Sequence, residues 1–215
     1  MSLTLVIGNK NYSSWSLRPW LAMKQAGLAF DEVRIPLGRP ETTAQILRYT
    51  PSGRVPCLID GALAVWDSMA ICEYVNEQYA GGSLWPNDVG RRARARSVAA
   101  EMHSGFTALR TQLPMDMRAR RPDKGETAMA RPQVAAEVAR IHGLWSDCLS
   151  ASGGPFLFGG FSIADAFFAP VVTRFRTYAI PLAAPLARYS DAVFTLPAMQ
   201  QWEDAAAIEP ETIED

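Results

Sequence analysis

Two adjacent serines, Ser13 and Ser14, stand where a short apolar run gives way to a helical pattern. The run Leu3–Ile7 is typical of a buried strand, and the spacing of apolar residues predicts a helix over 16–26. The first turn of a helix has free N–H donors and a partial positive charge, so a hydroxyl there can help to keep a thiolate ionised near neutral pH. The alternative is a serine that only caps the helix.

A second candidate feature is Val55-Pro56, directly before an apolar strand predicted over 57–60. A cis bond before Pro56 would leave the Val55 N–H and C=O facing outward, ready to pair with an extended peptide ligand. Few X–Pro bonds are cis, so an ordinary proline at a sheet edge is the alternative.

The pair Asp67-Ser68 precedes a helix predicted over 68–79. Either side chain can cap that helix. The Ser68 hydroxyl and N–H can also donate to a ligand carboxylate, whose charge the helix end favours, and Asp67 can bind a ligand ammonium. In contrast, Ser162 and Asp165, three residues apart before another apolar helix, are interpreted as a structural capping box.

The elements that must position these residues differ between the two halves of the chain. Strands are predicted over 3–7, 30–35, 57–60 and 63–66, and helices over 16–26, 42–49 and 68–79. The order βαβ followed by αββα predicts an α/β domain with one parallel crossover and one hairpin.

The rest of the chain is predicted to be all-α. Helices are expected over 91–113, 134–151, 163–178 and 197–207, after a Gly- and Pro-containing linker. We therefore expect a first domain over 1–80, a linker over 81–90 and a helical domain over 91–215.

Composition argues against several classes of protein. The formal net charge is −1, and 48% of the residues are hydrophobic, which fits a globular chain without a general affinity for nucleic acid or anionic lipid. Residues 91–131 hold 10 basic and 4 acidic side chains. This stretch has no tyrosine or tryptophan, so we interpret it as a solvated helix face and expect no nucleic-acid partner.

Metal and membrane sites are not expected either. The three cysteines are widely spaced and the two histidines have no cysteine nearby, so no metal site is predicted. No run approaches the length of a membrane span, and the N-terminal residues do not resemble a signal peptide. A cytoplasmic location is the expectation.

Taken together, the order and spacing of these features resemble the cytosolic glutathione transferase family over almost the whole chain. Val55-Pro56, Asp67-Ser68 and Ser162–Asp165 match its most diagnostic positions, and Ser-Ser-Trp-Ser-Leu-Arg over 13–18 looks closest to the zeta class. The resemblance implies a thioredoxin-like first domain that binds glutathione, a helical bundle that supplies the electrophile pocket, and a homodimer.

The resemblance also assigns roles to residues. Ser13 aligns with the zeta thiol-activating serine, and Ser14 is the next candidate. Val55, beside Pro56, would pair with the cysteinyl main chain of glutathione, and Asp67 and Ser68 would hold its γ-glutamyl end. Partners for the glycyl carboxylate would be Arg39 and Arg54.

The implied activity is glutathione transfer, with glutathione as co-substrate and no metal. Trp15 stands where the zeta class has a reactive cysteine, which disfavours chemistry on an enzyme thiol. The electrophile would contact residues of the helical domain and Trp15; the candidates are Trp15, Met102, Phe106, Arg110 and Arg174. The alternatives are an isomerase similar to maleylacetoacetate isomerase, a lyase, dehalogenase or peroxidase using the same site, and a non-catalytic interaction protein on this scaffold.

Overall fold

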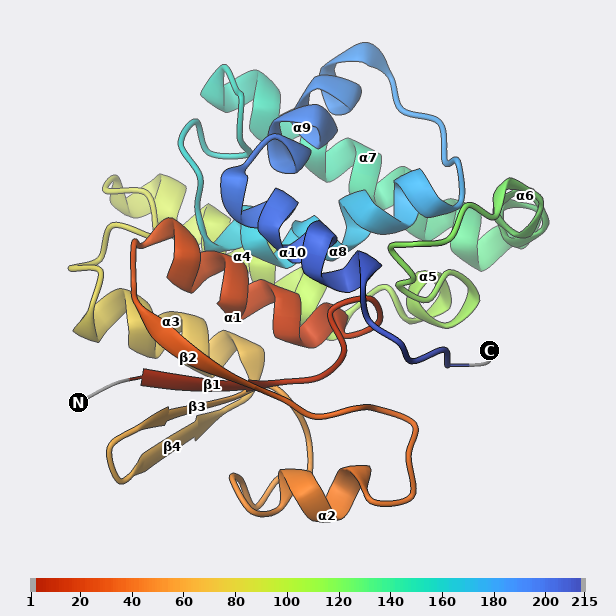
Figure 1. Ribbon diagram of the computed structural model, residues 1–215. Helices are drawn as coiled ribbons and strands as arrows, with labels where there is room; N and C mark the ends of the chain where they lie inside the picture. Colours follow the sequence, from red (N-terminus) through yellow and green to blue (C-terminus); the bar gives the residue numbers. More distant parts are fainter. Residues whose placement is uncertain (1–2, 214–215) are drawn as a thin grey trace.

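A four-stranded sheet forms the base of the N-terminal half (Figure 1). The computed structural model describes residues 3–213. Its strands are β1 (Leu3–Ile7), β2 (Phe30–Arg34), β3 (Cys57–Asp60) and β4 (Leu63–Trp66), in the spatial order β2-β1-β3-β4. β1 pairs parallel with β2 and antiparallel with β3, and β3 and β4 form a hairpin. The predicted crossover and hairpin are therefore confirmed.

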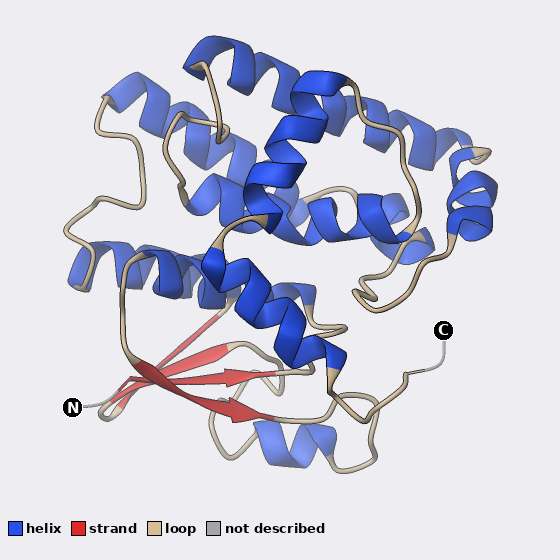
Figure 2. Cartoon of the chain, turned by 45° about the horizontal axis from the view of Figure 1, so that its top comes forward, coloured by secondary structure: helices blue, strands red, loops and turns tan. Residues whose placement is uncertain are grey.

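The alternation of side chains along β1 divides the core between the two faces of the sheet. Leu3, Leu5 and Ile7 pack into the main core under α1 (Ser14–Gln25) and α3 (Ser68–Gln78). Val6 points the other way and packs with Ile46 of α2 (Thr42–Ile46) in a small second cluster. Figure 2 shows α2 on the face of the sheet opposite the remaining helices.

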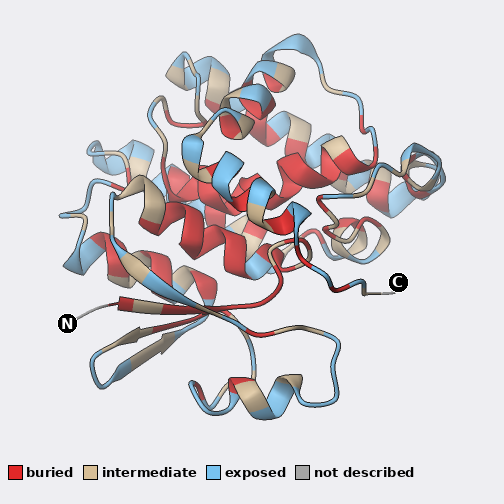
Figure 3. Ribbon diagram, viewed as in Figure 1, coloured by how far each residue is buried: buried red, intermediate tan, exposed pale blue. Residues whose placement is uncertain are grey.

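The C-terminal half is helical, as predicted, and its core is continuous with that of the first half (Figure 3). Its central helix α8 packs against both α1 and α4 and is buried over most of its length. The helices of this half are α4 (Val89–Ser104), α5 (Thr107–Gln112), α6 (Pro122–Met129), α7 (Pro132–Ser152), α8 (Ile163–Thr177), α9 (Ala184–Phe194) and α10 (Pro197–Ala207).

The predicted single helix over 91–113 is wrong. The chain breaks at Gly105 and Phe106, and Phe106 is left-handed with φ 58°. Arg110 stabilises the break, because its guanidinium donates to the carbonyls of Met102, His103 and Gly105 at the end of α4. The sequence prediction also omitted α6 and α9, and α2 ends at Ile46 rather than at Tyr49.

The predicted cap of α8 is confirmed. The buried Asp165 carboxylate accepts hydrogen bonds from the Ser162 N–H at 2.8 Å, the Ser162 hydroxyl at 2.9 Å and the Leu157 N–H at 3.0 Å. Burial nevertheless raises the pKa of Asp165 to about 6. Within residues 3–213, no helix has the length and apolar character needed to cross a membrane.

Candidate functional site

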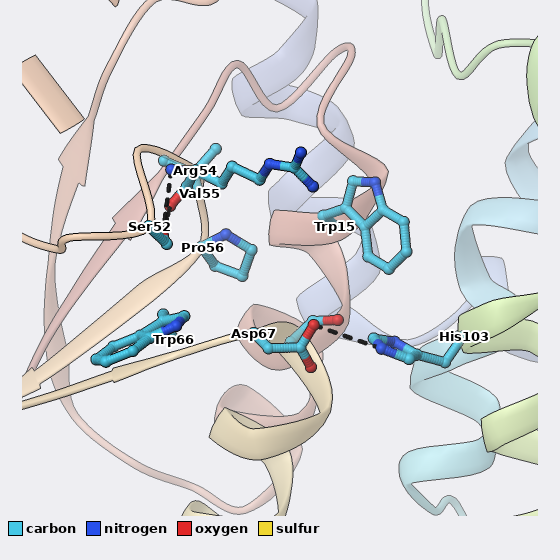
Figure 4. A pocket seen from close by; sticks show the side chains of 9 residues that line it. Trp15, Ser52, Arg54, Val55, Pro56, Trp66, Asp67 and His103 are labelled. Carbon is cyan, nitrogen blue, oxygen red and sulfur yellow. Dashed lines mark hydrogen bonds and ion pairs between the residues drawn. The ribbon is translucent and has the colours of Figure 1, made fainter. Parts of the chain in front are cut away.

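A cavity of about 630 Å³ collects most of the sequence-predicted binding residues (Figure 4). Its walls come from the N-terminal half and from His103 of α4. The lining residues are Trp15, Ser52, Arg54, Val55, Pro56, Trp66, Asp67, Ser68 and His103. The ends of separate elements, namely α1, the loop before β3, the end of β4 and the start of α3, therefore meet around one space.

The Val55-Pro56 peptide bond is cis, and both residues line this cavity. Between residues 3 and 213, no turn, loop or cap hydrogen bond occupies the main chain of Val55. The preceding turn is fixed locally, because the Ser52 hydroxyl accepts from the Arg54 N–H at 3.2 Å and lies 3.3 Å from the Arg54 carbonyl. In Figure 4 the Arg54 side chain extends over the cavity toward Trp15.

Asp67 and Ser68 combine a helix cap with groups that face the cavity. Asp67 is the N-cap of α3 and accepts from the Met69 N–H at 2.8 Å. Its φ of 74° is in the left-handed region, a strained conformation for a non-glycine residue that is often retained at functional sites. The Ser68 hydroxyl is buried and has no hydrogen-bond partner in the described chain. A ligand carboxylate would supply an acceptor for it.

His103 is a cavity residue that the sequence analysis did not select. Its Nε2 lies 3.4 Å from Oδ2 of Asp67, and its ring packs between Trp15 and Phe167. Burial lowers the pKa of His103, with a smaller opposing effect from Asp67. In the sequence, His103 was an interior residue of the helix predicted over 91–113, and that position gives no information about a partner so far away along the chain.

The two candidate serines occupy different environments at the start of α1. Ser13 is the N-cap: its Oγ accepts from the Ser16 N–H at 3.3 Å and lies 2.7 Å from the Ser16 Oγ. Ser14 lines a second cavity of about 310 Å³. That cavity is bounded by Tyr12, Ser14, Trp15, Arg110, Pro114, Met115, Asp116, Arg174 and Ile213.

Trp15 forms part of the wall of both cavities. Its ring lies between two guanidinium groups, with Arg18 at 4.2 Å and Arg110 at 4.8 Å from the ring centroid. Such cation–π contacts hold an exposed aromatic ring in a fixed position. The two cavities therefore adjoin at Trp15.

Three arginines lie in or beside the wall of the smaller cavity, which also contains Asp116. Arg110 and Arg174 line it directly, and the wholly buried Arg18 lies behind Trp15 without a hydrogen-bond partner for its guanidinium among residues 3–213. Burial lowers the pKa of Arg174 to about 9, and burial together with Arg110 and Arg174 lowers that of Arg18. A bound anion would offset the electrostatic repulsion among these three guanidinium groups.

Some predicted site residues lie elsewhere. Arg39, in the loop after β2, lines neither of these cavities, and the same holds for the buried Met102 and Phe106. All three cysteines are buried with raised thiol pKa values, because burial disfavours the thiolate. Among residues 3–213, no group of three or more His, Cys, Asp or Glu side chains is placed to hold a metal ion.

Comparison with known proteins agrees with this architecture. Residues 12–78 match the family described as glutathione S-transferase, N-terminal domain, and residues 91–205 match glutathione S-transferase, C-terminal domain. A glutathione S-transferase zeta class from Euphorbia esula is 28% identical over 170 residues, which cover 76% of this chain and 74% of the relative. A dichloromethane dehalogenase from Methylorubrum extorquens is 38% identical over only 65 residues, or 29% and 23% of the two chains.

Solved structures show the same fold. A bacterial zeta-class maleyl pyruvate isomerase superimposes with a TM-score of 0.73 at 22% identity, covering 98% of this chain and 100% of the other. A glutathione transferase homologue from Burkholderia, solved with bound glutathione, has a TM-score of 0.69 at 24% identity and covers 96% and 98%. The two domain matches together extend over most of the sequence, and this chain belongs to the glutathione S-transferase family.

Proposed function

We propose that this protein binds glutathione in the larger cavity and ionises its thiol at the start of α1. The thiolate then attacks a small electrophile in the smaller cavity, and the new C–S bond forms as the electrophile's leaving group departs. The observation that carries the proposal is that Trp15 lines both cavities, so a site large enough for a short peptide and a candidate acceptor site adjoin at one residue. The serines at the N-terminus of α1 adjoin that residue.

Each part of glutathione has a complementary group in the larger cavity. The free main chain of Val55 suits the cysteinyl peptide unit, and the unpartnered Ser68 hydroxyl at the start of α3 suits the γ-glutamyl carboxylate. Asp67 suits the ammonium. Arg54 extends over the same cavity and suits the glycyl carboxylate, and we prefer it to Arg39 for that reason.

We assign the hydrogen bond to the thiolate to Ser14, because its side chain lines the acceptor cavity whereas Ser13 is engaged in the cap. A free thiol has a pKa near 8.5, so lowering it by about two units requires roughly 2.7 kcal/mol of preferential stabilisation. One hydrogen bond to the charged sulfur and the partial positive charge of the helix end are together of that size.

A glutathione-dependent isomerase is the second candidate, and the arginines favour it. Arg110 and Arg174 on the acceptor cavity suit an electrophile that carries a carboxylate. In an isomerase the sulfur would add to such a substrate and leave again, so glutathione would be regenerated in each turnover. We also predict that the protein is a homodimer located in the cytoplasm.

Two measurements on the purified protein test the proposal. Calorimetric titration with glutathione is expected to give saturable binding, and a panel of neutral and anionic electrophiles is expected to show thiol-dependent turnover. Conjugate accumulation supports transfer, and substrate rearrangement without thiol consumption supports the isomerase. Binding with no turnover would favour the non-catalytic alternative, and no binding at millimolar glutathione would contradict all three.

A further inference from the structure

The C-terminal segment, residues 208–213, returns from the helical half to the loop that carries the serines. α10 ends at Ala207, and the chain then runs past the loop between β1 and α1 (Figure 1). We call residues 8–13 the serine loop, because it ends at Ser13 and leads directly into Ser14. The segment also reaches the acceptor cavity, where Ile213 forms part of the wall.

One carboxylate of this segment is bound to the main chain of the serine loop. Oε1 of Glu209 accepts from the Lys10 N–H at 2.7 Å, and Oε2 accepts from the Asn11 N–H at 3.0 Å. The Glu209 side chain is only 5% exposed, and Arg34 lies 3.8 Å away. A buried carboxylate that accepts two consecutive N–H groups holds that stretch of backbone in one position.

Those two N–H groups have no other partner in the described chain. The turn of the serine loop is made by the Tyr12 and Ser13 N–H groups, which both donate to the Asn9 carbonyl. Lys10 is held from its other side as well, because the Trp202 indole N–H of α10 donates to its carbonyl at 2.8 Å. The loop is therefore held by Glu209 and by Trp202 of α10 as well as by its own turn.

A second set of contacts ties the same segment to Asn11. Arg118 donates to the main-chain carbonyls of Glu209 and Glu211, and its own N–H donates to the Asn11 side chain at 3.0 Å. The Tyr12 hydroxyl lies within hydrogen-bond distance of both Arg118 and the Ile213 N–H. These bonds bring the C-terminal segment, the loop before α6 and the serine loop into one network.

We propose that Glu209 is a positioning residue for thiol activation, acting through the Lys10 and Asn11 main chain on the serines that follow. This inference rests on the proposed function. A hydroxyl can stabilise a thiolate only within hydrogen-bond distance, so a small displacement of the serine loop weakens that bond. Glu209 would then affect sulfur ionisation although its carboxylate faces the loop backbone.

Glu209→Gln is the direct test, since an amide has one acceptor oxygen where the carboxylate has two. We expect the pKa of bound glutathione thiol to rise by about one unit, which corresponds to about a tenfold lower thiolate fraction at pH values well below that pKa. With a native bound-thiol pKa near 6.5, turnover at pH 6.5 is expected to fall about fivefold, approaching tenfold at lower pH, and to recover as the pH passes the new pKa, while glutathione affinity changes less than threefold. The thiolate absorbance measured against pH gives this pKa directly.

The matched control is Glu203→Gln, which removes a negative charge from α10 where the carboxylate contacts Arg176 instead of the loop. It is expected to leave the thiol pKa unchanged. If Glu209→Gln does not fold, Glu209→Asp replaces it. The shorter side chain cannot reach both N–H groups, so the same rise in the thiol pKa is expected. A folded Glu209 variant with lower thermal stability and an unchanged thiol pKa would overturn the inference, as would an equal shift in the control.

The failure of the inference can be distinguished from that of the proposed function. If Ser14→Ala raises the thiol pKa and Glu209→Gln does not, only the role of Glu209 is lost. If neither Ser13→Ala nor Ser14→Ala changes the thiol pKa, serine activation fails and the role of Glu209 fails with it.

Discussion

The imidazole of His103 lies 3.4 Å from the carboxylate of Asp67, joining the last turn of α4 to the N-cap of α3 across the larger cavity. Asp67 is the residue we assign to the ammonium of glutathione. The helical half therefore reaches the peptide site through His103 as well as the acceptor site through its arginines.

This contact predicts a pH-dependent glutathione affinity. Burial lowers the pKa of His103, so the ring is neutral at pH 7 and becomes charged as the pH falls below that lowered value. A protonated ring neutralises Asp67 and competes with the ammonium. Calorimetry is expected to show weaker binding at pH 5.5 than at pH 7.5 in the native protein and a reduced difference in His103→Gln.

His142→Gln is the control for this experiment, because His142 on α7 also has a pKa lowered by burial but packs against Phe175 rather than the cavity. Its binding is expected to follow the native pH profile. If the glutathione affinity of His103→Gln also changes with pH as in the native protein, His103 does not control the affinity.

Ser68→Ala is expected to weaken glutathione binding by about 1–3 kcal/mol, since a hydrogen bond to a charged carboxylate is lost. The Ser68 hydroxyl has no partner within residues 3–213, so its removal leaves no protein group newly unsatisfied. Thermal stability is therefore expected to change little. A calorimetric affinity equal to that of the native protein would remove Ser68 from the site.

Asp67→Asn separates binding from capping. The amide oxygen can still accept from the Met69 N–H, whereas the negative charge facing the ligand ammonium is gone. We expect weaker glutathione binding with a melting temperature close to the native value. Weaker binding accompanied by a large loss of stability would assign the effect to the helix cap instead.

Arg174→Gln tests the acceptor cavity. The guanidinium donates from Nε to the Leu113 carbonyl at 2.9 Å and from Nη1 to the Pro170 carbonyl at 3.0 Å while lining the cavity. We expect kcat/KM for an anionic electrophile to fall about tenfold more than for a neutral one, because the lost interaction is with charge. Arg176→Gln, on the same helix but paired with Glu203, is the control. Equal losses for both electrophiles would contradict an anion site.

Asp165 predicts a pH dependence of stability. Its folded-state pKa of about 6 exceeds the ordinary value of 3.8, so between these values the folded state binds more protons than the unfolded state. Its contribution to the unfolding free energy therefore decreases as the pH rises from 3.8 to 6, by at most about 3 kcal/mol. Denaturant unfolding of Asp165→Asn at several pH values checks this, and a stability difference from native that is constant with pH would contradict it.

The sequence was informative where a local signal determines the structure. Apolar runs and alternation located the strands, and Ser162 with Asp165 marked the start of α8. The break at Gly105 was missed because Arg110, several residues later, donates to the carbonyls that end α4. That stabilisation is not visible in hydrophobic spacing.

The same contrast between local signals and tertiary contacts applies to the candidate site. Val55-Pro56, Asp67-Ser68 and Trp15 were selected from the sequence, and all of them line the larger cavity. His103 and Glu209 were not, because each contacts a residue that only tertiary packing brings near. A histidine or glutamate in or just after a helix is compatible with many surface roles.

Serine activation is tested most directly by the pKa of glutathione thiol bound to the native protein, to Ser13→Ala and to Ser14→Ala, measured from thiolate absorbance against pH. The account predicts a bound-thiol pKa well below 8.5 in the native protein, raised by one unit or more in Ser14→Ala and less in Ser13→Ala. A native bound-thiol pKa equal to that of free glutathione, or one unchanged in both variants, would contradict it.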